Sequence, residues 1–149
     1  MRVQLVNPPP FKINDQYDAP DFPQLGLATL AGYLITKGVT DISVIDAKFE
    51  RLDYDAILRR LAAYKPDIIG ITAMTNEVIQ AAKVASLIKE RFPQITTVIG
   101  GIHVSVLPEQ TLKEFPSFDI GIVGQGEISL HQLIKALEQG GDLQAVKGI

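Results

Sequence analysis

Five short runs of apolar residues, most of them β-branched, alternate with longer segments of helical period. This alternation constrains the fold more than any other feature. The runs span residues 3–6, 42–45, 68–71, 97–99 and 120–123. None shows the alternation of apolar and polar residues that is typical of a sheet with one solvated face. Because no hairpin signal joins any two of them, the runs predict parallel strands that helices cover on both sides.

The segments between the runs carry apolar residues at helical spacing and end at residues that commonly stop helices. They span residues 23–38, 53–66, 78–93, 108–115 and 128–141, while residues 11–22 form a polar, irregular connection. Asp53 is a good N-cap, and Gly38, Pro66 and Gly140 are typical stops. A strand–helix pattern repeated five times predicts an α/β fold. We expect a three-layer, doubly wound domain whose five-stranded parallel sheet has the flavodoxin-like, Rossmann-like order 2-1-3-4-5.

Composition excludes several classes of function. The chain has 149 residues, enough for one ordinary domain, and a net charge of -3 without a basic cluster, so we expect no nucleic-acid partner. It has no cysteine, which excludes thiolate metal sites and iron–sulfur ligands within these residues. The longest apolar segment, residues 25–35, is too short to span a membrane. These features are typical of a cytoplasmic protein.

The unusual sequence is concentrated in four loops that follow predicted strands, at residues 7–10, 72–77, 100–105 and 124–127. In a doubly wound fold, ligands bind outside the carboxyl ends of the strands. The loops offer hydroxyl groups and bare glycine backbone but no cluster of cations. This combination suits a large, weakly charged, hydrogen-bonding ligand better than a bare phosphate. A dinucleotide fingerprint needs Gly-x-Gly-x-x-Gly after the first strand, where this chain has prolines.

Several residues of these loops have a structural interpretation beside the functional one. Gly100 and Gly101 could form a tight turn that needs positive φ, or a flat surface for a ligand. His103 lies on the predicted loop between Gly101 and the helix that begins at Pro108. It could contact a ligand or donate a proton to it, or it could cap that helix.

The remaining candidates leave similar alternatives. Thr75 could be a helix cap, and Met74 could be core filler or a cofactor contact. Glu127 could favour a helix dipole, contact a ligand or contact another domain. We expect Asp46 to cap a turn and His131 to lie on the surface of the last helix.

Four segments in order resemble the amino-terminal cobalamin-binding domain of radical S-adenosylmethionine (SAM) enzymes. They are Asn7-Pro8-Pro9, residues 67–75, residues 100–105 with Pro108-Glu109, and residues 124–127. The resemblance covers nearly the whole chain and is greatest to the group of the anaerobic magnesium-protoporphyrin IX monomethyl ester oxidative cyclase. This group also includes methyltransferases, so the resemblance is less specific for a substrate.

The resemblance implies cobalamin as the cofactor and assigns roles to particular positions. Thr72 and Met74 match the segment that faces the corrin ring and its nucleotide tail, and the glycine pair matches the surface against which the dimethylbenzimidazole tail packs. The family's Gly-Glu-Gly-Glu occurs with glutamine at its second position. The implied cofactor-binding residues are Asn7, Pro8, Thr72, Met74, Thr75, Gly100, Gly101, His103, Ser105, Gly124, Gly126 and Glu127.

The resemblance also implies what these residues lack. The cobalt-ligating Asp-x-His-x-x-Gly segment of cobalamin mutases is replaced by Asn7-Pro8-Pro9-Pro10, so we expect no histidine from that loop on cobalt. Residues 1–141 would be the cobalamin-binding domain. Residues 142–149 would begin a linker to a radical SAM domain, which would hold S-adenosylmethionine and a [4Fe-4S] cluster. We expect no catalytic residue and no metal ligand in this chain, which alone would not catalyse.

Two other functions remain open at this point. The domain could have kept its fold, lost the cofactor and now dock a neighbouring domain or a partner. It could also be a sensor for another nucleotide-tailed small molecule.

Overall fold

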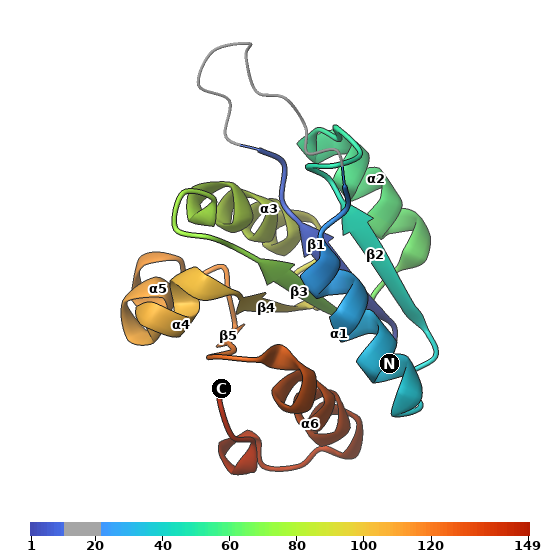
Figure 1. The fold of residues 1–149 in the computed structure, drawn as a ribbon, viewed down its shortest axis with the longest axis vertical. Helices are drawn as coiled ribbons and strands as arrows, with labels where there is room; N and C mark the ends of the chain where they lie inside the picture. Colours follow the sequence, from blue (N-terminus) through green and yellow to red (C-terminus); the bar gives the residue numbers. More distant parts are fainter. Residues whose placement is uncertain (11–21) are drawn as a thin grey trace.

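A computed structural model of the chain, which describes residues 1–10 and 22–149, contains one five-stranded parallel sheet (Figure 1). The strands are β1 (Val3–Asn7), β2 (Ile42–Asp46), β3 (Ile68–Thr72), β4 (Thr96–Gly100) and β5 (Ile120–Gly121). Their order is β2-β1-β3-β4-β5, and every neighbouring pair is parallel. Both the strand order and the direction confirm the prediction.

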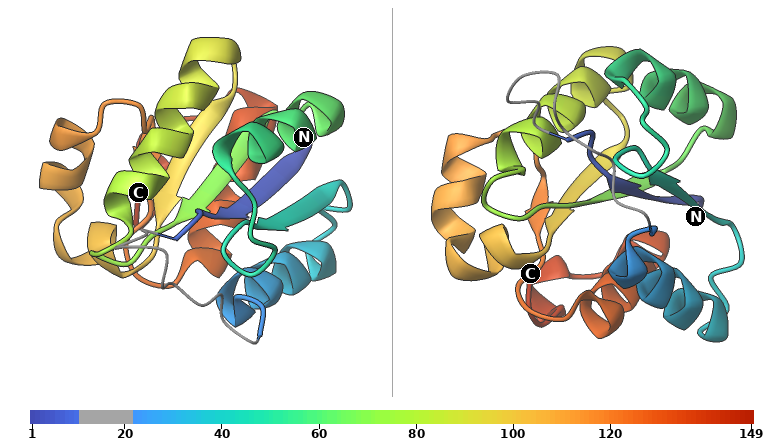
Figure 2. Two further views of the ribbon diagram at one scale, coloured as in Figure 1. Left: turned by 90° about the horizontal axis from the view of Figure 1, so that it is seen from above. Right: turned by 45° about the horizontal axis from the view of Figure 1, so that its top comes forward.

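Helices cover the two faces of the sheet, so the domain has three layers as predicted. They are α1 (Leu25–Thr36), α2 (Tyr54–Tyr64), α3 (Val78–Arg91), α4 (Ile102–Val106), α5 (Pro108–Glu114) and α6 (Gly126–Gln139), followed by the 3₁₀ turn η1 (Leu143–Ala145). In the right-hand view of Figure 2, α2 and α3 lie above the sheet and α1 and α6 lie below it. The short helices α4 and α5 lie beside β4 and β5.

The pleat of each strand divides its side chains between two separate cores. On β1, Val3 and Leu5 belong to the core beneath α1 and α6, whereas Val6 belongs to the core beneath α2 and α3. On β3, Ile68 and Ile69 divide in the same way. Successive side chains of a strand point to opposite faces, so apolar runs without alternation fill both cores.

The predicted helix stops and one predicted cap occur in the structure. Asp53 is the N-cap of α2 and its Oδ1 accepts a hydrogen bond from the Ala56 amide at 2.8 Å. Gly140 ends α6 with φ 62°, a left-handed conformation that glycine adopts without a steric penalty. At α3 the interpretation of Thr75 as a helix cap is wrong, because the N-cap residue is Glu77.

Two expected segments differ from the structure at the carboxyl edge. The predicted loop carrying His103 and Ser105 is the helix α4, because the Ser105 amide and hydroxyl both donate to the Gly101 carbonyl, the hydroxyl at 2.7 Å. The predicted strand 120–123 is shorter, since β5 ends at Gly121. Beyond Gly101 the chain of β4 turns into α4, so Val123 has no ladder partner there and instead donates to the Gly148 carbonyl at 2.8 Å.

The carboxyl-terminal segment packs on the domain. Val146 is buried and belongs to the core beneath α1 and α6, and Gly148 lies beside the end of β5 through its bond to Val123. The interpretation of residues 142–149 as the start of a linker stays a prediction. The expected irregular connection at 11–22 lies outside the described residues, apart from Phe22.

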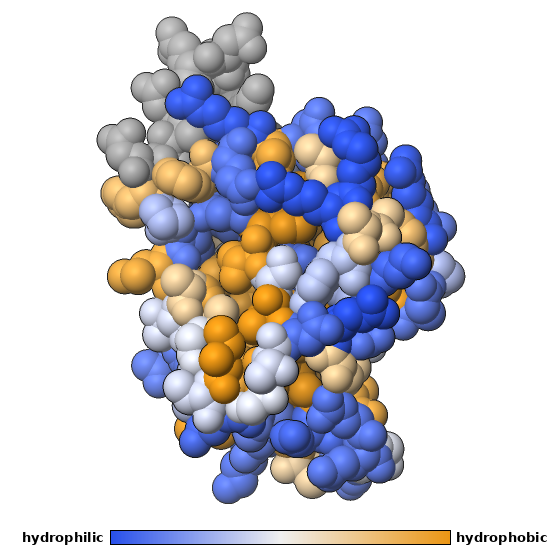
Figure 3. All heavy atoms as spheres, turned by 90° about the vertical axis from the view of Figure 1, so that its right-hand side faces the viewer, coloured by the Kyte–Doolittle hydropathy of each residue, from blue (hydrophilic) through white to orange (hydrophobic). Residues whose placement is uncertain are grey.

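One edge of the sheet is formed by β2, whose Val44 is 40% exposed. Figure 3 shows the side of the molecule on which β2 and α2 lie, where apolar atoms form a band among hydrophilic ones. Over residues 1–10 and 22–149, none of the helices combines the length and apolarity needed to cross a bilayer.

Candidate functional site

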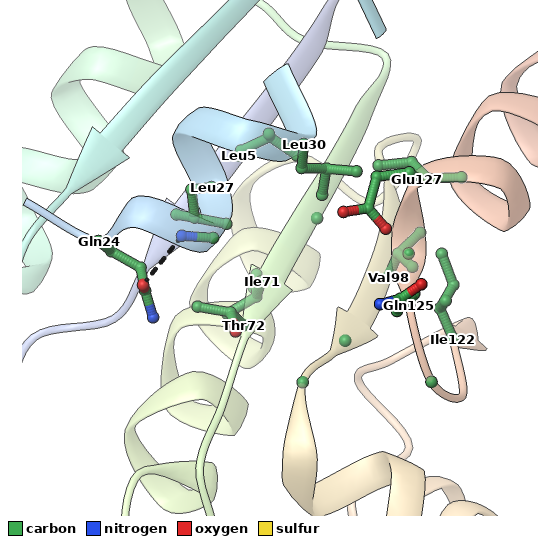
Figure 4. Close-up of a pocket in the computed structure, with 17 residues that line it drawn as sticks. Leu5, Gln24, Leu27, Leu30, Ile71, Thr72, Val98, Ile122, Gln125 and Glu127 are labelled. Atoms are coloured by element: carbon green, nitrogen blue, oxygen red, sulfur yellow. Dashed lines mark hydrogen bonds between the residues drawn. The ribbon is translucent and has the colours of Figure 1, made fainter. Parts of the chain in front are cut away.

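A cavity of about 220 Å³ opens at the carboxyl edge of the sheet, between α1 and α6 (Figure 4). Its floor is the face of β1, β3 and β4 that these two helices cover. Its mouth lies among the loops that follow β3, β4 and β5. The cavity thus occupies the carboxyl edge at which the four unusual loops predict a site.

The floor is hollow because the middle residue of a cross-strand row is glycine. Leu5, Gly70 and Val98 are register partners on the adjacent strands β1, β3 and β4, and all three line the cavity. A Cβ placed on Gly70 would lie 3.1 Å from Leu5 Cδ2, so a side chain there would press on the leucine. With glycine, no side chain rises from the floor between Leu5 and Val98.

The walls are apolar and the polar side chains lie at the mouth. Leu27 and Leu30 of α1 face Leu130 of α6 across the cavity. The polar side chains among the lining residues are Gln24, Thr72, Gln125 and Glu127. Figure 4 shows the side-chain amide of Gln24 bonded to the first turn of α1, where its Oε1 accepts from the Gly26 backbone amide at 3.2 Å.

The sequence left open whether Gly100 and Gly101 form a tight turn or a flat surface for a ligand, and the two glycines differ in this respect. Gly101 has φ 98°, and a Cβ there would lie 2.7 Å from the Ala73 carbonyl oxygen, so its role in the turn is sufficient reason for glycine. Both glycines line the cavity, but Gly100 has ordinary strand conformation, and a Cβ there would meet nothing within 4 Å. Gly100 therefore leaves space in the cavity that the backbone does not require.

Ser105 links two of the edge loops and does not line the cavity. Its hydroxyl donates to the Gly101 carbonyl at 2.7 Å and accepts from the Gly124 amide at 2.9 Å. Gly124 and Gly126 line the mouth, and Gly124 has φ 78° with nothing within 4 Å of where a Cβ would stand. Ser105 thus holds the loop after β5 against the loop after β4.

The end of β1 helps to fix the loops at the carboxyl edge. Asn7 is 5% exposed, and its Nδ2 donates to Asp46 Oδ1 at 2.8 Å. Asp46 Oδ2 accepts from the backbone amide of Gln24 at 2.6 Å, which fixes the chain just before α1. Asp46 Oδ1 accepts from the Phe49 backbone amide, so Asp46 caps a turn as expected. Pro8 is buried, and neither it nor Asn7 is among the residues that line the cavity.

The loop that follows β3, residues 73–77, does not line the cavity. Met74 is 51% exposed, so it is not core filler, and the Thr75 hydroxyl lies 3.3 Å from Nδ1 of His103. His103 is 8% exposed and lines a separate surface hollow with Thr75 and Gln80, away from the α1–α6 cavity. Its ring lies beside Thr75, ahead of α3, and no side chain caps α5.

An ion pair that the sequence did not suggest holds this loop. Glu77 is 5% exposed, its Oε1 pairs with Lys48 Nζ, and its Oε2 accepts from the Met74 amide at 3.2 Å. Lys48 follows β2, so the pair joins two loops of the carboxyl edge. A capping-type acidic residue before a helix is too common a signal to identify such a pair in advance.

Sequence reasoning also missed the walls of the cavity and misplaced one histidine. Leu30 and Leu130 have the spacing of ordinary helix core positions, and Gly70 alone carried a signal, as an isolated glycine inside a strand. His131 is half-buried, because its ring packs edge-on against Tyr33 at 6.5 Å between ring centroids. Within residues 1–10 and 22–149, His131 Nε2 is buried without a hydrogen-bond partner. Among the same residues, no group of three or more His, Cys, Asp and Glu could hold a metal ion.

Comparisons with known proteins agree on one family. The family model described as B12 binding domain matches residues 17–134. The chain is 36% identical over 152 residues to the anaerobic magnesium-protoporphyrin IX monomethyl ester cyclase of Rubrivivax gelatinosus, covering 100% of this chain and 27% of the relative. It is 34% identical over 149 residues to an uncharacterized methyltransferase of Pyrococcus horikoshii, covering 100% of this chain and 32% of the relative.

A solved structure agrees with these relatives. The cobalamin-dependent S-adenosylmethionine radical enzyme OxsB, with aqua-cobalamin and S-adenosylmethionine bound, superposes with a TM-score of 0.82 at 26% identity. The match covers 99% of this chain and 20% of the enzyme. This chain therefore spans between about a fifth and a third of the length of these three proteins.

Proposed function

The chain belongs to the B12-binding domain family, and we propose on this premise that the cavity between α1 and α6 receives the nucleotide tail of cobalamin. The corrin ring would then lie over the carboxyl edge of the sheet. The observation that carries the proposal is the open space at Gly100, where an added Cβ would meet nothing within 4 Å, in a cavity that Gly70 also lines. A base-and-ribose tail is long and flat enough to use such a slot.

The residues of the cavity fit this group. Gly100 and Gly124 leave bare backbone at the mouth, and both have open space where a side chain would stand. Thr72, Gln125 and Glu127 offer hydrogen-bonding groups where the polar ribose of the tail would pass. When bound, cobalamin supplies a redox-active cobalt centre. The chain itself would hold and orient the cofactor, and Met74 would lie beneath the ring.

We propose further that the intact protein is a radical SAM enzyme of the oxidative cyclase type or a cobalamin-dependent radical SAM methyltransferase. S-adenosylmethionine and a [4Fe-4S] cluster would bind outside this chain, which has no cysteine. Exposed apolar side chains at the cofactor edge, Met74, Ile102 and Val106, support docking of a further domain there. A cytoplasmic location is consistent with this chemistry and is part of the proposal.

Binding of hydroxocobalamin tests the cofactor assignment. The purified chain is titrated while its visible spectrum is followed, and the mixture is passed over gel filtration. Gly100→Phe should weaken binding by about a hundredfold or more, since the ring would fill the cavity with no positive φ to disturb. The matched control is Gly32→Phe, because Gly32 is exposed on α1 and its Cβ would also meet nothing within 4 Å.

The same variants separate the proposal from a cofactor-free docking domain. If the chain only docks a neighbour, Gly100→Phe leaves the activity of the full-length enzyme intact. If neither the chain nor the full-length protein binds hydroxocobalamin, the proposal is wrong.

A further inference from the structure

The inner end of the α1–α6 cavity offers a ligand no hydrogen-bonding group among its described lining residues. The side chains there are Leu5, Leu27, Val98, Ile122 and Leu130, each at most 5% exposed. The polar lining residues Gln24, Thr72, Gln125 and Glu127, which are labelled in Figure 4, are in contrast half-buried or exposed. The cavity is thus polar at its mouth and apolar at its inner end.

The backbone of the floor is also unavailable. Leu5, Gly70 and Val98 belong to interior strands, and each is paired with residues of both neighbouring strands. Their N–H and C=O groups are therefore used in the ladders of the parallel sheet. A polar atom of a ligand that reached this floor would lose its water and find no partner, which is costly.

We infer that this cavity selects the base of the nucleotide tail and favours a benzimidazole with an apolar outer edge over a purine. The inference rests on the proposed function. The outer edge of 5,6-dimethylbenzimidazole carries two methyl groups, which an apolar floor accommodates without loss. The corresponding edge of adenine carries an amino group and ring nitrogens, each of which would be buried unpaired.

The selection is tested by equilibrium binding of three corrinoids to the purified chain. They are cobalamin, its adenine-containing analogue adeninylcobamide, and cobinamide, which lacks the nucleotide. Cobalamin should bind at least about tenfold more tightly than adeninylcobamide, which corresponds to one or more unpaired buried groups. Cobinamide should bind more weakly than cobalamin, because it leaves the cavity without an apolar occupant.

The variant Val98→Thr tests the floor directly. It places a hydroxyl group at a residue that is 1% exposed, with little change of volume. The new hydroxyl should lower the preference for cobalamin over adeninylcobamide by about threefold or more. The matched control is Val44→Thr on β2, which lies outside the cavity and is 40% exposed, and which should leave the preference unchanged. The two free ligands differ in how firmly cobalt holds the base, but this difference cancels when variant and wild-type ratios are compared.

The outcomes separate the inference from the proposed function. Equal affinities for cobalamin and adeninylcobamide, both tighter than cobinamide, overturn the base selection and leave the proposed function standing. Equal affinities for all three overturn the placement of the tail in this cavity. If Val98→Thr does not fold, as judged by circular dichroism, the wild-type comparison is repeated with the dicyano forms of the three corrinoids and then decides alone, because cyanide displaces the base from cobalt in both nucleotide-bearing ligands.

Discussion

The two faces of the sheet are built from the same strands, yet one is filled and the other is hollow. Beneath α2 and α3 the strands present bulky branched side chains, and α3 approaches them through small ones. The strand residues are Val6, Ile45, Ile69, Ile71 and Ile99, and the helix residues are Ala81, Ala82 and Ala85. Beneath α1 and α6 the corresponding rows contain Gly70 and Gly100, and the cavity opens there.

The difference shows how a sheet can separate stability from binding. Because side chains alternate between faces, a glycine at one strand position empties one face and leaves the other intact. Gly70 lies between Ile69 and Ile71, which both pack on the filled face. One layer can thus stabilise the fold while the opposite layer keeps room for a ligand.

Matched leucine truncations on the two faces should give the largest effects. Leu61 on α2 and Leu130 on α6 are 1% and 2% exposed. Leu61→Ala should lower the free energy of unfolding by about 3–4 kcal/mol, because it leaves a closed cavity. Leu130→Ala should cost about 2 kcal/mol, since the space it vacates joins an existing opening.

Urea unfolding followed by circular dichroism measures both losses. The effects on cobalamin affinity should have the opposite order: Leu130→Ala should bind more weakly than the wild type, and Leu61→Ala should bind as the wild type does. Equal losses of stability together with equal affinities would contradict the division into a filled and a hollow face.

The glycines at the rim of the hollow face should differ in what an added methyl group costs. Gly101→Ala combines positive φ with a contact of 2.7 Å to the Ala73 carbonyl oxygen, so it should destabilise the fold by about 2–3 kcal/mol. At Gly124 the added Cβ would meet nothing within 4 Å, so only the positive φ opposes alanine there. Gly124→Ala should therefore lower the free energy of unfolding by about 1 kcal/mol. Thermal and urea denaturation of the two variants test this order, which identical losses would refute.

The ion pair that joins the loops after β2 and β3 lies at the rim on the filled side. Lys48→Met should lower the free energy of unfolding by about 1–2 kcal/mol, because the carboxylate of Glu77 is 5% exposed and loses a cation. The control is Lys113→Met, whose partner Glu109 is exposed, and which should change stability by at most about 0.5 kcal/mol. Urea unfolding at neutral pH distinguishes them. A Lys48 variant as stable as the control would show that the pair is not needed to hold the loop.

The smallest effect should come from Asp119, at the amino edge of the sheet and away from the cavity. Burial acts to raise the pKa of Asp119, but hydrogen bonds from Lys89 Nζ and the Thr97 amide outweigh it and hold the pKa below its usual value. A lowered pKa in the folded state stabilises the fold above the unfolded value of about 3.9 and ceases to do so as the pH falls through the folded value.

Asp119→Asn should therefore reduce stability at pH 7 by less than about 1 kcal/mol, since the side chain is partly exposed and screened. The gap between wild type and variant should close as the pH falls below about 4. Urea midpoints measured from pH 7 to pH 3 test this trend, and cobalamin affinity at neutral pH should not change. A gap that widens in acid would reverse the assigned sign.

Particular residues show how far the sequence predicted the site. Six of the predicted residues at strand ends line one cavity in the structure: Thr72, Gly100, Gly101, Gly124, Gly126 and Glu127. Their contact with cobalamin stays a prediction. His103 also follows a strand, yet α4 turns its ring toward Thr75, because a helix directs successive side chains around its axis whereas a loop does not.

The sequence by itself determined the layer architecture, the strand order and the edge of the sheet at which the cavity opens. Apolar runs and glycine-rich strand ends are local features, and the geometry of parallel strands brings their carboxyl ends together. Only the tertiary structure decided which face is hollow and which of two adjacent glycines the backbone requires. Both depend on atoms far apart in the chain: Gly70 empties a floor that Leu5 and Val98 frame, and Gly101 is confined by Ala73. Such distances are set by packing, which no local pattern encodes.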